Sequence, residues 1–230
     1  MNDQKLVIAI DGPAAAGKGE IAARLARKFN LLYVYTGAMY RALALVCIRG
    51  GISFKDEQKV KALLEHSTID MRIPGENSTF PYTIVLNGED VTQRIVKQDT
   101  ADGASDVGSL PSVREWMVRR QKELAQGKRV VMEGRDIGLR VLPDATLKIY
   151  LTASLEVRAK RRFDQWQAAG IQKTFEETRR DTEYRDTQDM TRLTDPLQKV
   201  PDAWELDTTH MSPGEVIAAI SAELNRRGAL

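Results

Sequence analysis

A glycine-rich segment near the amino terminus narrows the possible folds of this chain more than any other part of the sequence. It follows an apolar run at 6–10 that is typical of a buried strand, and it precedes residues 21–29, where apolar positions recur at helical spacing. A Walker A loop requires this context of strand, loop and helix. Its glycines let successive backbone amides point into one concavity, the helix N-terminus adds partial positive charge, and its lysine reaches the β- and γ-phosphates. The pattern predicts a nucleoside triphosphate site, with a glycine-rich turn and a surface lysine as the alternative. The residues expected to bind the triphosphate are Gly12, Pro13, Ala14, Ala15, Ala16, Gly17, Lys18, Gly19 and Glu20.

Strand-like and helix-like patterns alternate at both ends of the chain, as they do in a parallel sheet covered by helices. Short runs of buried-strand type occur at 129–132, 146–151 and 203–207. A final helix should start after Ser212, with Pro213 first and Glu215 third, and continue through Leu224. We therefore predict a single α/β domain over residues 1–230, with a P-loop nucleoside triphosphatase core of parallel strands and flanking helices.

Two segments depart from this alternation. Residues 68–90 alternate apolar and polar side chains around a turn at 74–78 and end on Asn87-Gly88, which predicts antiparallel hairpins. Residues 158–192 are rich in Arg and Asp and too charged for a core, which favours a helical lid. We expect a core at about 1–62 and 129–230, a small antiparallel insertion at about 63–128 that binds a nucleoside monophosphate, and a lid at about 158–195.

The composition excludes several classes of protein. With 42% apolar residues the chain can bury a core, and its net charge of +2 combines 34 basic with 32 acidic residues, so no nucleic-acid partner is expected. No apolar stretch is long enough to span a membrane, so no membrane association is expected either. The single cysteine, Cys47, lies in an apolar run and predicts a buried thiol in a reducing compartment. We expect a cytoplasmic protein.

Several further segments bear on the second substrate. They are Tyr35-Thr36-Gly37-Ala38-Met39-Tyr40-Arg41, Glu133-Gly134-Arg135-Asp136-Ile137-Gly138, and shorter matches at 87–92, 142–145 and 206–209. In this order they resemble the bacterial cytidylate kinase family over nearly the whole chain. The resemblance implies ATP-dependent phosphorylation of CMP and dCMP by a monomer. It also implies Mg²⁺ that enters with ATP and is held mostly by phosphate oxygens and water, because no cluster of metal-ligating side chains is present.

The resemblance implies residues for the acceptor nucleotide. Thr36, Tyr40 and Arg41 would lie beside the monophosphate, where a guanidinium makes paired bonds to phosphate. Arg41 could instead cap a surface helix, and Tyr40 could be a packing residue. Ser105, Arg114 and Asp136 would read the base, since Ser105 and Asp136 can accept from the cytosine amine while Arg114 donates to its ring acceptors. The alternative for Asp136 is a salt bridge to a neighbouring arginine.

The lid carries the family's Arg-Asp-x-x-Asp-x-x-Arg pattern from Arg185 to Arg192. The resemblance implies that Arg135, Arg185 and Arg192 surround the phosphates and, with Lys18, perform the catalytic work, while Asp189 reaches the pentose. Without the resemblance, such alternating charges indicate a solvated helix face. The family also places arginines near the ATP adenine, and Arg158 and Arg161 are the candidates among the neighbouring basic residues.

Two positions depart from the family pattern. Glu20 replaces a threonine and Tyr35 replaces an aspartate, while Gly19 lacks the hydroxyl of a general Walker A motif. A carboxylate at position 20 is favoured by the helix dipole and could hold Mg²⁺ through water, so we expect Glu20 to compensate for the acid absent at Tyr35. Two alternatives to a cytidylate kinase stay open: a catalytically impaired or regulatory nucleotide-binding homologue, and a P-loop kinase for a different small molecule.

Overall fold

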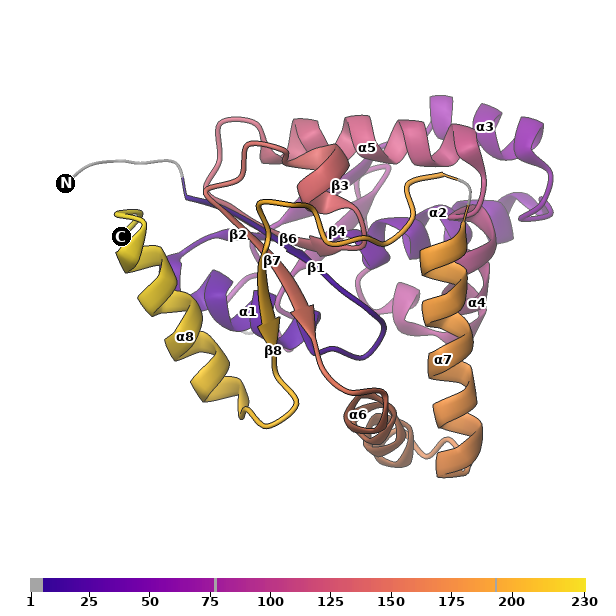
Figure 1. Cartoon of the computed structure of the whole chain (residues 1–230). Coiled ribbons are helices and arrows are strands. Elements are labelled where there is room, and N and C mark those ends of the chain that lie inside the picture. Colours follow the sequence, from indigo (N-terminus) through magenta and orange to yellow (C-terminus); the bar gives the residue numbers. More distant parts are fainter. Residues whose placement is uncertain (1–5, 77, 193) are drawn as a thin grey trace.

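The computed structural model describes residues 6–76, 78–192 and 194–230, so Asn77 of the expected turn at 74–78 and Leu193 in the expected lid lie outside the described residues. A parallel five-stranded sheet forms the centre of the fold, in the order β2-β6-β1-β7-β8 (Figure 1). Its strands are β1 (Val7–Asp11), β2 (Leu32–Tyr35), β6 (Val130–Gly134), β7 (Leu147–Thr152) and β8 (Trp204–Asp207). The predicted α/β fold with a parallel sheet is confirmed. The short strand β2 was not among the predicted strands, although its run of apolar and aromatic residues is a β signal.

Helices surround this sheet. They are α1 (Lys18–Phe29), α2 (Thr36–Gly50), α3 (Glu57–Glu65), α4 (Gln98–Val107), α5 (Pro111–Ala125), α6 (Leu155–Ala168), α7 (Phe175–Thr191) and α8 (Pro213–Arg226), with short turns η1 (Arg94–Val96) and η2 (Ile137–Val141). Helix α8 packs beside α1 and starts at the predicted capping box, in which Ser212 and Glu215 satisfy each other's backbone amides. Helix α2 buries Cys47, and burial raises the pKa of this thiol to about 11, as expected for an inert structural cysteine.

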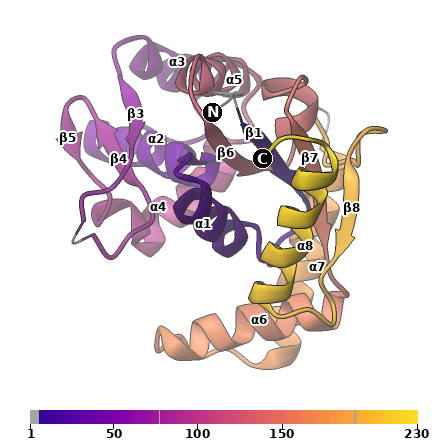
Figure 2. The same ribbon diagram turned by 90° about the vertical axis from the view of Figure 1, so that its left-hand side faces the viewer.

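A second, antiparallel sheet follows α3. Its strands are β3 (Ile69–Arg72), β4 (Thr83–Leu86) and β5 (Glu89–Asp90), in the order β3-β4-β5. Asn87 and Gly88 both have positive φ values, 50° and 87°, at the predicted tight turn between β4 and β5. Figure 2 shows this sheet on the opposite side of the molecule from β8 and α8. The predicted small antiparallel sheet is confirmed.

The arrangement of the parallel strands brings several loops to one edge. The P-loop follows β1, Thr36 follows β2, Arg135 follows β6, and helix α6 follows β7. In a parallel α/β sheet, ligands bind at this carboxyl edge of the strands. Helices α6 and α7 pack against each other below and beside that edge (Figure 1). Among the described residues, no helix is both long and apolar enough to cross a lipid bilayer.

Candidate active site

One large cavity, of about 1290 Å³, opens at the carboxyl edge of the sheet. Its wall is formed by the P-loop, the start of α2, the end of β6, and residues of α4, α5, α6 and α7. It is lined by most of the residues predicted from the sequence: Ala14, Ala15, Ala16, Gly17, Lys18, Gly19, Glu20, Thr36, Tyr40, Arg41, Ser105, Arg114, Arg135, Asp136, Arg161, Arg185, Asp189 and Arg192. Gly12, Pro13 and Arg158 do not line it. Most of the residues predicted for ATP and for the acceptor nucleotide therefore line the same cavity.

The P-loop takes its shape from glycine. Gly12 has φ 149°, and a Cβ atom there would lie 2.0 Å from the carbonyl oxygen of Leu151, so only glycine fits between the loop and β7. Gly17, at φ 95°, ends the loop where α1 begins. The Lys18 Nζ donates to the carbonyl oxygens of Gly12 and Pro13, each at 2.7 Å. Gly12 and Pro13 thus hold the lysine through their backbone.

Lys18 is buried, with only 5% of its surface exposed. Burial lowers its pKa to about 7, and the charge of Arg135 adds to this, while Glu133, Asp189 and Asp11 oppose it. A bound polyphosphate would favour the charged form of the amine. The loop therefore holds a lysine whose protonation depends on its ligand.

The proposed base-reading residues form a buried ion pair. Arg114 Nη2 lies 2.5 Å from Asp136 Oδ2 and 3.4 Å from Asp195 Oδ2, with only 4% of the arginine side chain exposed. The salt bridge to a neighbouring arginine, weighed for Asp136 as an alternative, is present. Arg114 Nε is fully buried and has no hydrogen-bond partner among the described residues.

Other acceptor-side residues surround this pair. Ser105 is exposed on α4 and lines the cavity, while burial raises the pKa of Tyr40 to about 12 and keeps its phenol neutral. Thr36 donates its hydroxyl to the Glu133 carbonyl at 2.8 Å, which fixes the start of α2 against β6. Arg41 is half-buried and donates to the Ile95 carbonyl at 3.2 Å, leaving other guanidinium donors for the cavity.

Helix α7 brings the lid residues over this edge. Arg135 Nε contacts Asp189 Oδ2 at 2.5 Å, which joins the end of β6 to the lid. Arg192 Nη2 lies 3.5 Å from Asp136 Oδ1, so α7 and the residue after it also reach the pair of Arg114 and Asp136. Arg185 is exposed, lines the cavity and forms no ion pair with any described residue. Asp189 and the three arginines are thus brought together, with Arg185 the one that remains unpaired.

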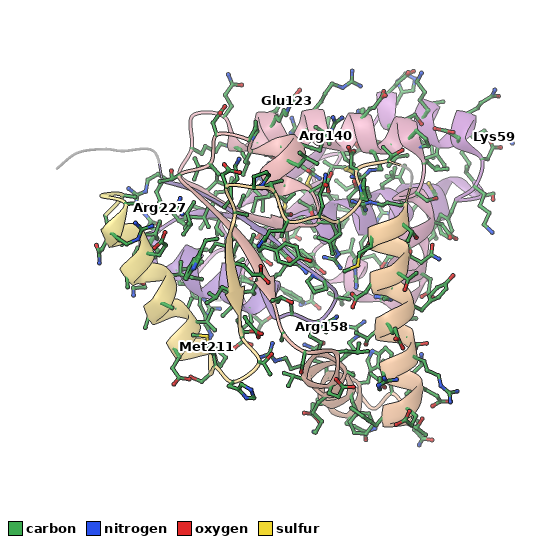
Figure 3. All side chains as sticks on the ribbon, viewed as in Figure 1. Lys59, Glu123, Arg140, Arg158, Met211 and Arg227 are labelled. Carbon is green, nitrogen blue, oxygen red and sulfur yellow. The ribbon has the colours of Figure 1, made fainter. Side chains whose placement is uncertain are left out.

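The structure separates the two candidates for the adenine site. Arg161 lines the cavity and donates to the Ala16 and Thr208 carbonyls. Arg158 is buried at the root of the lid (Figure 3), where it pairs with Asp186 and donates to the Ala14 carbonyl at 3.1 Å. Asp186 in turn accepts the Ala14 amide at 3.0 Å. Arg158 and its partner Asp186 therefore bind the P-loop backbone at Ala14, and Arg158 does not line the cavity.

The two departures from the family pattern occupy different surroundings. Glu20 is exposed and pairs with Arg24 at 2.8 Å, one helical turn away. The Tyr35 ring stacks beside Tyr33 and meets Tyr82 edge-on, so it belongs to an aromatic cluster on the cavity wall. Its packing leaves no room for a side chain at Gly37, where a Cβ atom would lie 2.6 Å from the ring.

Glu133 was quoted in a motif but was not predicted as a site residue. It is buried, lines the cavity, and accepts the Tyr33 hydroxyl at 3.2 Å. A Cβ atom on Gly19 would lie 3.4 Å from Glu133 Oε1, which places the carboxylate against the P-loop. No ion pair joins Glu133 to any described residue. Its position at the end of an apolar strand was the available signal, because strand ends carry site residues in this fold class.

Comparison with known proteins agrees with this geometry. The sequence profile described as "Cytidylate kinase" matches residues 8–226. A protein named cytidylate kinase from Geobacillus kaustophilus (strain HTA426) is 43% identical over 224 residues, covering 97% of this chain and 98% of that protein. Another of that name, from Limosilactobacillus reuteri (strain DSM 20016), is 44% identical over 217 residues, covering 94% and 93%. The solved structure of an uncharacterized protein from Eubacterium ventriosum ATCC 27560 shares the fold, with a TM-score of 0.52 at 11% identity over 97% of this chain and 99% of that one.

Proposed function

The chain belongs to the cytidylate kinase family, and we propose that the large cavity at the carboxyl edge of the sheet binds ATP and CMP or dCMP side by side for phosphoryl transfer. The enzyme is a nucleoside-monophosphate kinase that phosphorylates CMP and dCMP to CDP and dCDP, using ATP. The assignment of individual residues to the two nucleotides rests on the geometry described above.

The buried pair of Arg114 and Asp136 carries the choice of base. Cytosine presents an amine donor beside the N3 and O2 acceptors, which matches a carboxylate acceptor next to a guanidinium donor on the cavity wall. Uracil has a carbonyl in place of the amine, so Asp136 would face an acceptor in a desolvated site. An unpaired buried polar group costs about 1–3 kcal/mol, and this disfavours UMP.

The phosphates would lie between the P-loop and the lid. The P-loop amides and Lys18 bind the β- and γ-phosphates, and Arg41 holds the α-phosphate of the acceptor. Arg135, Arg185 and Arg192 stabilise charge on the group in transfer, which is the main source of catalysis in such reactions. Asp189 would exchange its bond with Arg135 for the pentose hydroxyls when the acceptor is bound. Arg161, beside Ala16 and Thr208, is the remaining candidate for the adenine.

We keep the expected subdivision as part of this proposal: a core at about 1–62 and 129–230, an acceptor-binding insertion at about 63–128, and a lid at about 158–195. Closure of the lid over both nucleotides would exclude water from the γ-phosphate. A monomeric state and a cytoplasmic location also remain predictions.

The residues near the P-loop fit Mg²⁺ that arrives with ATP. Among the described residues, the Glu133 carboxylate suits this ion best, because it is buried against Gly19 and has a hydroxyl donor but no cationic partner. Bound Mg²⁺ would neutralise charge on the β- and γ-phosphates. Glu133 would orient the hydration shell of that ion, and Tyr33 would fix the carboxylate. Glu20 is a weaker candidate, because it is exposed and paired with Arg24.

The alternatives kept open by the sequence are not favoured. Both relatives described above are named cytidylate kinase, and each aligns with this chain over nearly its whole length. Neither is named a regulator or a kinase of another small molecule. Tyr35 and Glu20 leave the P-loop backbone and Lys18 in place, since Lys18 keeps both of its carbonyl contacts.

A coupled assay of ADP release with CMP, dCMP, UMP, AMP and dTMP tests the proposal. CMP and dCMP should give the highest kcat/KM, and UMP should be at least about tenfold poorer if one buried polar group is left unpaired. Equal rates across the panel, or binding of CMP without ADP release, would refute the proposed use of this cavity.

A further inference from the structure

Asp11 does not line the cavity, yet it connects the P-loop to the turn η2 that follows Asp136. It is the last residue of β1 and directly precedes Gly12 of the P-loop. Its Oδ1 accepts the Ile137 amide at 2.8 Å, and its Oδ2 accepts the Gly138 amide at 2.8 Å. The side chain is 7% exposed, so these two bonds are made away from solvent. A carboxylate that accepts two backbone amides is a strong, directional clamp.

The two amides belong to the first turn of η2, which directly follows Asp136. The first amides of a helix lack partners within it, and an N-cap side chain normally accepts from them. Asp136 stands at that N-cap position but makes no capping bond, because its carboxylate contacts Arg114 and Arg192 instead. Asp11, at the end of β1, therefore supplies the acceptor for these amides that the N-cap residue Asp136 does not supply.

Gly138 packs closely beside the clamp. A Cβ atom there would lie 3.2 Å from the Lys148 Cδ, which is a tight contact, and 3.4 Å from Asp11 Oδ2, which is an ordinary van der Waals contact. Glycine therefore avoids pressure on the Lys148 side chain, which packs against the clamped turn from β7.

We infer that Asp11 is a positioning residue: by capping η2 it frees the Asp136 carboxylate to read the acceptor base and fixes the base-reading turn relative to the P-loop. The inference rests on the proposed function for its effect on CMP, although the clamp itself can be measured without substrate. It assigns a role to a residue that touches neither nucleotide.

The clamp needs the ionised carboxylate, because a neutral carboxyl group presents a hydroxyl hydrogen to one of the two amides. Burial raises the pKa of Asp11 to about 6; the amide bonds of Gly138 and Ile137 oppose this, Asp136 adds to it, and Lys18 on α1 opposes it. From β7, the Lys148 stem packs at Gly138 and the neutral phenol of Tyr150 faces the same carboxylate. Asp11 is thus ionised above about pH 6 and loses one of its two bonds below it.

Asp11→Asn is the direct test, because it keeps the shape but replaces one accepting oxygen by a donor. The KM for CMP should rise about tenfold, the loss expected for one hydrogen bond to a charged group, while the KM for ATP stays within about twofold. Amide exchange at Ile137 and Gly138 should accelerate in the same variant. Asp144→Asn removes an exposed carboxylate from the loop after η2 and should change none of these values.

The pH profile separates positioning from a general structural role. The ratio of wild-type to Asp11→Asn kcat/KM for CMP should be about tenfold at alkaline pH and fall toward one below the pKa of Asp11. Protonation of CMP itself cancels in that ratio. A ratio that does not change with pH, an equal rise in both KM values, or an unchanged KM for CMP would overturn the inference.

The wild-type protein provides a second route if Asp11→Asn does not fold. Protection of the Ile137 and Gly138 amides, corrected for the intrinsic pH dependence of exchange, should fall as the pH drops below the Asp11 pKa of about 6; protection that does not change would overturn the inference. Failure of the wild-type enzyme to phosphorylate CMP would refute the proposed function. The exchange rates of the Ile137 and Gly138 amides would still decide whether Asp11 clamps the turn.

Discussion

Tyr35 and Glu133 lie directly opposite each other at the ends of the neighbouring parallel strands β2 and β6. The carboxylate that the family pattern carries at position 35 is absent, and the carboxylate nearest the P-loop glycine Gly19 comes from the adjacent strand instead. Glu20, which the sequence suggested as the compensating acid, is turned to Arg24. We therefore propose Glu133, in place of Glu20, for the expected acidic function.

The first prediction concerns this carboxylate. Glu133→Gln should lower kcat by about tenfold or more and shift the Mg²⁺ dependence to higher concentration, because the hydrated ion loses its buried acceptor. Calorimetry of ATP binding at several Mg²⁺ concentrations provides a readout independent of turnover. Glu20→Gln is the matched control and should shift neither curve; a shift for Glu20 and none for Glu133 would restore the original expectation. In double-mutant cycles on kcat, the effect of Tyr35→Asp should depend on whether Glu133→Gln is also present. It should not depend on whether Glu20→Thr is present.

A second prediction concerns Lys18, whose pKa burial lowers to about 7 in the nucleotide-free protein. The lysine is then largely neutral above that pH, whereas a bound triphosphate favours its charged form, so ATP binding should take up a proton. ATP affinity should correspondingly fall as the pH rises above the lysine pKa. Calorimetry of MgATP binding at about pH 8, in two buffers of different ionisation enthalpy, measures the uptake. Lys18→Met should abolish it, and proton release in the wild type would contradict the prediction.

A third prediction separates Asp136 from Arg192. Asp136→Asn should raise the KM for CMP about tenfold and narrow the preference for CMP over UMP, because it changes the group that faces the base. Asparagine is preferred to alanine because it keeps the size of the side chain and an accepting oxygen beside the buried Arg114, both of which alanine would remove. Arg192→Ala should chiefly lower kcat, by about a hundredfold or more, since its charge stabilises the transferring phosphoryl group. The opposite pattern in steady-state kinetics would mean that the two roles are exchanged.

The last prediction concerns the root of the lid, where Arg158 and Asp186 form a pair with side-chain exposures of 9% and 11%. Asp186→Asn should destabilise the protein by about 3–5 kcal/mol, because it leaves a buried guanidinium without its partner charge. Urea unfolding measures this loss, and amide exchange at Ala14 should accelerate because its acceptor is weakened. Lys160 and Asp164 form an exposed pair on α6, so Asp164→Asn should cost less than about 1 kcal/mol. Similar losses for the two variants would remove the proposed anchor.

Local features of the fold could be predicted from the sequence because their causes lie within a few residues. The spacing from Gly12 to Lys18 determines a phosphate-binding loop, since positive φ and the following helix start are local properties. The capping box of α8 and the Asn87-Gly88 turn are local in the same sense. The motifs around Arg41, Arg114 and Asp136 predicted an acceptor site, and the structure brings these residues to one cavity.

Only the tertiary structure decided the contacts between residues that lie far apart in the chain. Asp11 meets Ile137 across 126 positions, and Ala14 meets Asp186 across 172. These contacts depend on the order β2-β6-β1-β7-β8 and on how the lid helices return to the P-loop, which no local periodicity specifies. The same reason explains why Arg158, indistinguishable from Arg161 as a basic residue in sequence, turns away from the cavity: packing around its buried partner Asp186 determines its direction.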